Sequence, residues 1–194
     1  MNFRYWILSS DSSSPIGGVK QLYRLSEALA VSGRVSTLVS QTVDFVPSWF
    51  DSSASVISYD YWNKIDFNSS RDIIIMPETF VPYKSKYPAL KKIVFNQNAT
   101  YTLGVPPIFF DNSCPSSVLD SYLEDDILHT FCVSTYDYSF LSELVGIPVD
   151  RLSLLSNCIE PFFSFPQQMS NTITYMPRKN SHFQREFFSL LSRS

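Results

Sequence analysis

Two adjacent glycines, Gly17 and Gly18, stand in the segment "SSDSSSPIGGVKQLYRLSEALAVSGRVSTLVS" (9–40). They lie between an apolar run and an amphipathic stretch with helical spacing. A glycine allows a ligand to approach the backbone closely, and the start of a helix offers free N–H groups and a partial positive charge. Both features suit a phosphate group, so the pair predicts a site for a phosphate-bearing ligand. The alternative is that the glycines only permit a tight turn.

A carboxylate follows another apolar run. Glu78 comes directly after "DIIIMP" (72–77), which reads as a strand buried on both faces. Ligands of α/β sheets bind at the carboxyl ends of the strands, where Glu78 is expected. There it can accept a hydrogen bond from a sugar hydroxyl or act as a base. The alternative is a solvated loop carboxylate.

Several amides and a tyrosine follow a further apolar run, in "FNQNATYTLG" (95–104). Amides both donate and accept hydrogen bonds, which suits sugar hydroxyls, and a tyrosine ring can stack on a sugar. The candidate sugar-binding residues are Asn96, Gln97, Asn98 and Tyr101 together with Glu78. The alternative is a turn rich in Asn.

The elements that must position these residues alternate between strand and helix. Short runs rich in β-branched and aromatic residues predict strands at 3–8, 35–39, 55–59, 72–76, 92–96, 128–134, 152–155 and 172–176. Helical spacing and stop signals predict helices at 18–31, 116–124, 135–145 and 181–191. In the first helix Leu22, Leu25, Ala28 and Leu29 are expected to face the core, and in the third Phe140, Leu141, Leu144 and Val145. This order predicts an α/β fold with a doubly wound, mostly parallel, Rossmann-like sheet.

The chain is expected to divide near residue 165. The segment 157–172 carries two prolines and many polar residues between two strand-like runs, which is typical of a linker. Residues 1–165 are expected to form the Rossmann-like domain. Residues 166–194 are expected to form a linker and the first βα unit of an incomplete second domain.

Composition narrows the classes of partner. The net charge is −3 with no basic cluster, so nucleic acid is not an expected partner. The three cysteines, Cys114, Cys132 and Cys158, form no CxxC pair, so neither a disulfide framework nor a metal site is expected. The sequence shows no leader segment and no apolar run of about 18 residues, which predicts a cytoplasmic protein without a transmembrane segment.

The segment "PIGGVKQLYRLSEALAVSGRVSTLV" resembles the first β-loop-α-β unit of GT-B glycosyltransferases of the large group 1, family 4-like type. The matching residues are Gly17, Gly18, Leu29, Ala30 and Gly33; Arg34 stands where that family usually has His. "VGIPVDRLSLLSNCIEPFFSF" (145–165) resembles the segment that joins the two domains of that family. Here Cys158 replaces a usual glycine and Glu160 a usual Asp.

"FCVSTYDYSFLSEL" (131–144) is similar to a late strand and helix of the family, and "TITYMPRKN" (172–180) to the start of its C-terminal domain. The resemblance implies that Arg178 and, more loosely matched, Lys179 contact the donor diphosphate together with Gly17 and Gly18. It implies transfer of a sugar from a nucleotide-sugar co-substrate to a saccharide or other hydroxyl acceptor, without a metal. In that case the candidates on the acceptor side are Glu78, Asn96, Gln97, Asn98 and Tyr101. The sugar, the acceptor and any catalytic nucleophile stay unassigned.

The donor-binding half of the family has no counterpart within the 194 residues. We therefore expect weak or no transfer by this chain alone. Transfer would need either a separate chain that supplies the C-terminal domain as a partner, or a longer protein of which this chain is a fragment. One alternative is a non-catalytic domain that binds a saccharide or a partner. Another is a different Rossmann-like enzyme with a phosphate-bearing ligand. Against a dinucleotide enzyme, the three-glycine fingerprint is absent and Asp44 comes late for the ribose-binding acid.

Overall fold

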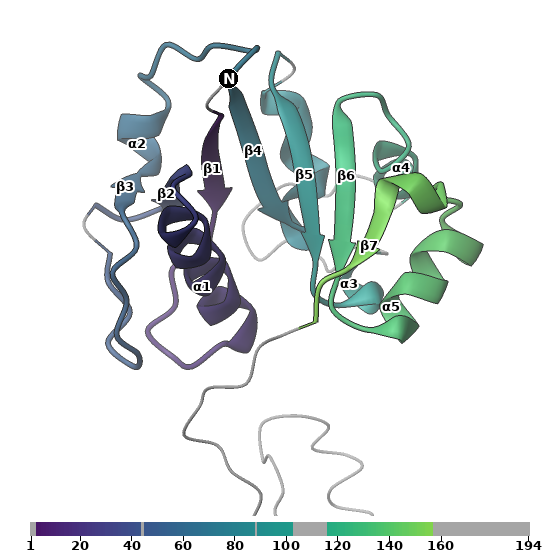
Figure 1. Ribbon diagram of the computed structural model, residues 1–194, viewed down its shortest axis with the longest axis horizontal. Helices are drawn as coiled ribbons and strands as arrows, with labels where there is room; N and C mark the ends of the chain where they lie inside the picture. The colour runs from purple at the N-terminus through teal and green to yellow at the C-terminus, as the bar shows by residue number, and fades with distance from the viewer. Residues whose placement is uncertain (1–2, 44, 88, 103–115, 157–194) are drawn as a thin grey trace, which may run out of the picture. The chain divides into compact units, whose positions relative to one another are not determined.

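The computed structural model describes residues 3–43, 45–87, 89–102 and 116–156 (Figure 1). Seven strands occur in this part of the chain: β1 (Arg4–Leu8), β2 (Val35–Ser40), β3 (Val56–Ser58), β4 (Asp72–Pro77), β5 (Lys91–Asn96), β6 (Ile127–Cys132) and β7 (Leu152–Leu154). They form one sheet in the order β3-β2-β1-β4-β5-β6-β7, and every pairing is parallel. The predicted α/β, Rossmann-like fold class is confirmed.

Apolar side chains cover the sheet on both faces. One core contains Ile7, Leu38 and Ile75 and is covered by α1 (Gly17–Val31), which crosses the front of the sheet in Figure 1. The other core contains Ile74 and Val94 and is covered by elements that follow β3, β4, β5 and β6. Since all of β4 is buried, its uninterrupted apolar run is explained by burial on both faces.

The helix α1 starts one residue before the predicted bound, and its buried face differs from the predicted stripe. Leu22 and Tyr23 lie at the centre of the contact with the sheet, and Ser26 is buried beside them. Ala28 is exposed, so its predicted inward position is wrong. The Ser26 hydroxyl contacts that of Ser36 in β2 at 3.1 Å, which explains why a small polar residue occupies the buried face.

Short helical elements connect the other strands. They are α2 (Tyr59–Trp62), the 3₁₀ segment η1 (Glu78–Lys86), α3 (Ala99–Thr102), α4 (Ser116–Ser121), α5 (Thr135–Ser139), the π-helical turn η2 (Phe140–Leu144) and the 3₁₀ turn η3 (Val149–Arg151). The predicted helix at 135–145 thus changes into a π turn at its midpoint. The wider turn alters the helical phase, so Leu144 is 73% exposed, whereas Leu141 and Val145 are buried as predicted.

The strand order changes direction between β1 and β4. At such a position the loops that leave the two neighbouring strands diverge to opposite faces and open a crevice at the carboxyl ends of the strands. The start of α1 follows β1, and Glu78 follows β4 directly. The fold therefore brings two of the predicted site segments to the same end of neighbouring strands.

Some expectations fall outside the described residues. They are the strand at 172–176, the helix at 181–191, the boundary near 165, the second domain at 166–194, and the two predicted diphosphate-binding residues, Arg178 and Lys179. Among the helices that the structure describes, none has the length and apolar character that crossing a membrane requires.

Candidate functional site

The loop between β1 and α1 is fixed by contacts with the segment that follows β2. Both carboxylate oxygens of Asp11 accept backbone N–H groups, from Gln41 at 3.0 Å and Thr42 at 2.7 Å. The indole N–H of Trp49 donates to the carbonyl of Ser12 at 3.0 Å. These contacts hold the loop, and therefore the start of α1, in place at the carboxyl end of the sheet.

The two glycines at the start of α1 have different surroundings. A Cβ atom added at Gly17 would have no atom of the described residues within 4 Å, whereas one at Gly18 would lie 2.7 Å from Oε1 of Gln97. Gly17 thus leaves the backbone open, and Gly18 makes room for the Gln97 carboxamide. Ile16 provides no side-chain cap, and the first turn contains no acidic residue. The partial positive charge at the start of the helix is therefore not balanced by an acidic residue in its own first turn.

Glu78 is buried, with 4% of its surface exposed, so it is not the solvated carboxylate of the alternative interpretation. Its Oε2 accepts the backbone N–H of Gln97 at 2.9 Å. Burial raises the pKa of Glu78 to about 7; the backbone hydrogen bonds oppose this shift, and the charge of Asp137 adds to it. Its carboxyl group therefore exchanges a proton near neutral pH.

A second buried carboxylate is Asp137 in the first turn of α5. It binds the other end of the short segment 97–99, whose first residue binds Glu78. Its Oδ1 accepts the backbone N–H of Ala99 at 2.8 Å, and its Oδ2 accepts the hydroxyl of Ser134 at 2.6 Å. Ser134 in return accepts the backbone N–H of Asp137, as the N-cap of α5. Glu78 and Asp137 thus hold the segment from Gln97 to Ala99 from two sides.

Asn96 faces the interior rather than a ligand. Its Nδ2 donates to the Thr102 hydroxyl at 2.6 Å and to the Tyr122 hydroxyl at 3.1 Å. Its Oδ1 is buried and has no hydrogen-bond partner among the described residues. Burial raises the pKa of Tyr122, and the charge of Glu78 adds to this effect. Asn96 and Tyr122 are therefore part of the buried surroundings of Glu78.

The two remaining predicted residues are Asn98, which caps a helix, and Tyr101, whose ring is exposed. Oδ1 of Asn98 accepts both the backbone N–H and the hydroxyl of Thr100, at 3.0 and 2.7 Å. Asn98 therefore caps α3, as the Asn-turn interpretation states. Tyr101 is 44% exposed, and Tyr136 in α5 is 66% exposed. Because Ala99 of α3 bonds to Asp137 of α5, the two helices that carry these rings are neighbours.

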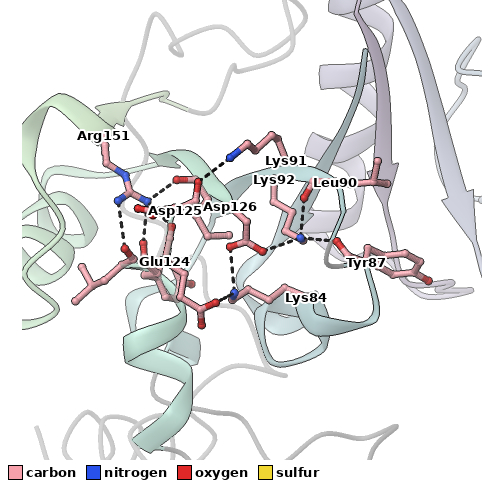
Figure 2. A network of polar contacts seen from close by, with 12 residues as sticks. Lys84, Tyr87, Leu90, Lys91, Lys92, Glu124, Asp125, Asp126 and Arg151 are labelled. Carbon is pink, nitrogen blue, oxygen red and sulfur yellow. Dashed lines mark hydrogen bonds and ion pairs between the residues drawn. The ribbon is translucent and has the colours of Figure 1, made fainter. Parts of the chain in front are cut away.

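A dense charge network lies at the opposite, amino end of the sheet (Figure 2). Lys92 in β5 is fully buried, and its Nζ donates to the carbonyls of Tyr87 and Leu90 and to Asp126 at 2.7 Å. Nζ of Lys84 contacts Asp126 at 3.1 Å and Glu124 at 2.5 Å. Each buried ammonium group thus has a carboxylate partner.

Arg151 completes this network by binding the backbone before β6 (Figure 2). Its guanidinium donates to the carbonyls of Leu123, Glu124 and Ile127. An open surface pocket borders the network and is lined by Pro82, Lys84, Ser85, Ser121, Leu123, Glu124, Asp125 and Asp126. Three of its charged side chains, Lys84, Glu124 and Asp126, already pair with one another, so we assign it a structural role.

Sequence reasoning missed Asp137 and the lysine network. A signal for Asp137 existed, because "STYD" (134–137) has the spacing of a capping box at a helix start. No local signal pairs Lys92 with Asp126, since 34 residues separate them. Within the described ranges, no group of three or more His, Cys, Asp and Glu residues has an arrangement that could hold a metal ion.

Comparison with known proteins assigns no family. No model of a known protein family matches the chain, and no curated protein matches it either. A functional assignment therefore depends on the fold and on the geometry at the carboxyl end of the sheet.

Proposed function

We propose that residues 1–165 act as the acceptor-side half of a GT-B-type glycosyltransferase that uses a nucleotide-sugar donor. The observation that carries this proposal is the start of α1. Its open Gly17 backbone, without a cap or an acidic neighbour in the first turn, follows β1 at the point where the strand order changes direction. Diphosphate groups bind at such positions.

The proposed chemistry is electrostatic. Sugar transfer from a nucleotide sugar releases a diphosphate, and N–H groups aligned toward the growing negative charge lower the barrier. Gly17 and Gly18 would offer those N–H groups, and the Gln97 carboxamide would supply a further donor beside them. The proposed contact of Arg178 and Lys179 with the diphosphate rests on the resemblance alone, since both lie outside the described residues. Glu78 is too deeply buried to be assigned as a nucleophile, so we assign none.

Binding of nucleoside diphosphates tests the proposal. Calorimetric titration with UDP, GDP and ADP, and with uridine as the control without phosphate, should give saturable binding of a diphosphate and none of uridine. Gly17→Phe fills the open space above the backbone and should weaken binding at least tenfold. The matched control is Val31→Phe at the far end of α1, where the native side chain is 90% exposed, and it should leave binding unchanged. Equal affinity in Gly17→Phe and wild type would contradict the proposed site.

A second candidate function is binding of a saccharide without chemistry. The exposed rings of Tyr101 and Tyr136, on neighbouring helices at the same end of the sheet, favour it. Aromatic rings of this kind supply stacking surfaces for sugars. Affinity for a glycan that is independent of any nucleotide, and lost in Tyr136→Ala, would support this candidate over the transferase.

A further inference from the structure

Two carboxylates at the carboxyl end of the sheet are buried without a cation. Glu78 and Asp137 are 4% and 5% exposed, and neither forms an ion pair with a residue of the described chain. Burial of an unpaired charge costs free energy, and a group in this position tends to take up a proton instead. Such an arrangement suggests a role beyond stability.

Gln97 connects Glu78 to the start of α1. The carboxylate accepts the backbone N–H of Gln97, and the side chain of the same Gln97 lies against Gly18. A Cβ at Gly18 would lie 2.7 Å from Oε1, 3.3 Å from Cδ and 3.5 Å from Nε2 of Gln97. The whole carboxamide is therefore packed against the first turn of the helix. Asp137 fixes the other end of the segment through Ala99.

We propose that Glu78 is a positioning residue whose charge decides, through the Gln97 backbone N–H, whether the Gln97 carboxamide lies against Gly18. A carboxylate holds that N–H strongly, and a neutral carboxyl group holds it weakly. Loss of the charge frees the Gln97 backbone and allows its side chain to leave the first turn of α1. The effect on ligand binding rests on the proposed function, but the proton-linked movement does not.

The groups around Glu78 favour a proton rather than an ion pair. The charge of Asp137 in α5 raises the pKa of Glu78, the charge of Glu78 raises the pKa of Tyr122 after α4, and the charge of Asp137 raises the pKa of Cys132 in β6. Burial and the Asp137 charge raise the pKa of Glu78 to about 7. The movement is therefore centred near neutral pH.

The lysines of the adjacent elements have other contacts. Lys84 of η1 pairs with Glu124 and Asp126, and Nζ of Lys20 in α1 lies 6.0 Å from the centre of the Phe50 ring. Nζ of Lys86 lies 5.6 Å from the centre of the Tyr83 ring. Among the described residues, no ion pair includes Glu78, so no lysine compensates its charge there.

NMR of the isotopically labelled full chain tests the proposal directly between pH 5.5 and 8.5. The backbone amide proton of Gln97 should shift with a midpoint near pH 7. The nuclear Overhauser contact between the Gln97 carboxamide and the Gly18 α-protons should be present above the midpoint and lost below it. In Glu78→Gln both signals should be independent of pH.

Wild type contains its own control. Glu27 also accepts a backbone N–H, from Ser53 at 2.8 Å. Burial acts to raise its pKa, but hydrogen bonds from Ser52, Arg24 and Ser53 outweigh this and lower it, so the Ser53 amide should not titrate in this range. A Gln97 amide without a titration, or a Gly18 contact that persists at pH 5.5, would overturn the proposal.

A second variant keeps the proposal testable if Glu78→Gln does not fold. Asp137→Asn removes the negative neighbour, so the Gln97 midpoint should move to lower pH. An unchanged midpoint would show that the proton does not belong to Glu78 and would overturn the assignment. Because no ligand is present in either measurement, failure of the proposed function would not affect the result.

Discussion

The amino and carboxyl ends of the sheet differ in how they hold buried charge. At the amino end, Asp72 contacts the Arg4 guanidinium at 2.6 Å, and Lys84 and Lys92 contact carboxylates. At the carboxyl end, Glu78 and Asp137 accept only N–H and O–H donors from the described residues. The same sheet thus balances its buried charges at one end and leaves them unbalanced at the other.

This difference separates buried charges that have an ion-pair partner from buried carboxylates that have none among the described residues. A paired and hydrogen-bonded buried ion fixes geometry, and loss of its partner is strongly destabilising. An unpaired buried carboxyl group lowers stability and persists where it has another role. The buried carboxylates without an ion pair therefore lie at the carboxyl end, and the dense ion network of Figure 2 lies at the other end.

The largest effect is expected at the amino end. Lys92→Met removes one of the two lysine partners of Asp126. It also removes the hydrogen-bond donor to the backbone carbonyls of Tyr87 and Leu90. We expect the free energy of unfolding to fall by about 3–5 kcal/mol, measured by urea unfolding. Lys91→Met at the adjacent exposed position should change it by less than about 0.5 kcal/mol. Equal losses of stability in Lys92→Met and Lys91→Met would contradict the structural role assigned to the network.

At the carboxyl end, removal of a buried charge is expected to stabilise the fold at neutral and higher pH. The pKa of Glu78 rises from 4.5 to about 7 on folding, so between these values the folded state binds more protons than the unfolded state. Its contribution to stability therefore falls as pH rises through this window. The free energy of unfolding of Glu78→Gln minus that of wild type should therefore increase by about 3 kcal/mol between pH 4.5 and pH 8.

A matched variant sharpens this prediction. Since the pKa of Glu27 is lowered on folding, Glu27 stabilises the fold above its unfolded pKa, and this contribution is lost as pH falls. Glu27→Gln should thus be less stable than wild type at pH 8, with a smaller difference at pH 4. If the stability of both variants relative to wild type changed in the same direction with pH, the contrast between Glu78 and Glu27 would be wrong.

The smallest effect is expected at the two glycines. Gly18→Ala should be less stable than Gly17→Ala by about 1 kcal/mol, because only the Gly18 methyl group meets the Gln97 carboxamide. In a Gln97→Ala background the two variants should agree within about 0.5 kcal/mol. A difference that persists in that background would show that Gln97 is not what Gly18 accommodates.

The sequence predicted the sheet well, because buried parallel strands are continuous apolar runs such as "DIIIMP" and "KIVFN". It placed Gly18, Glu78 and Gln97 near one end of the strands, but it did not predict that these residues contact one another. Side-chain contacts between segments 19 and more residues apart leave no periodic signal. Leu144 was misplaced because helical spacing assumes an α-helix, and the π turn changes the phase.

Chemical-shift mapping of a bound nucleoside diphosphate tests the central claim most directly. The account predicts that UDP, GDP or ADP shifts the backbone amides of Gly17, Gly18 and Gln97 and leaves those of Lys84 and Lys92 unchanged. Shifts confined to the amino end of the sheet, or no shift with any of the three nucleotides, would contradict it.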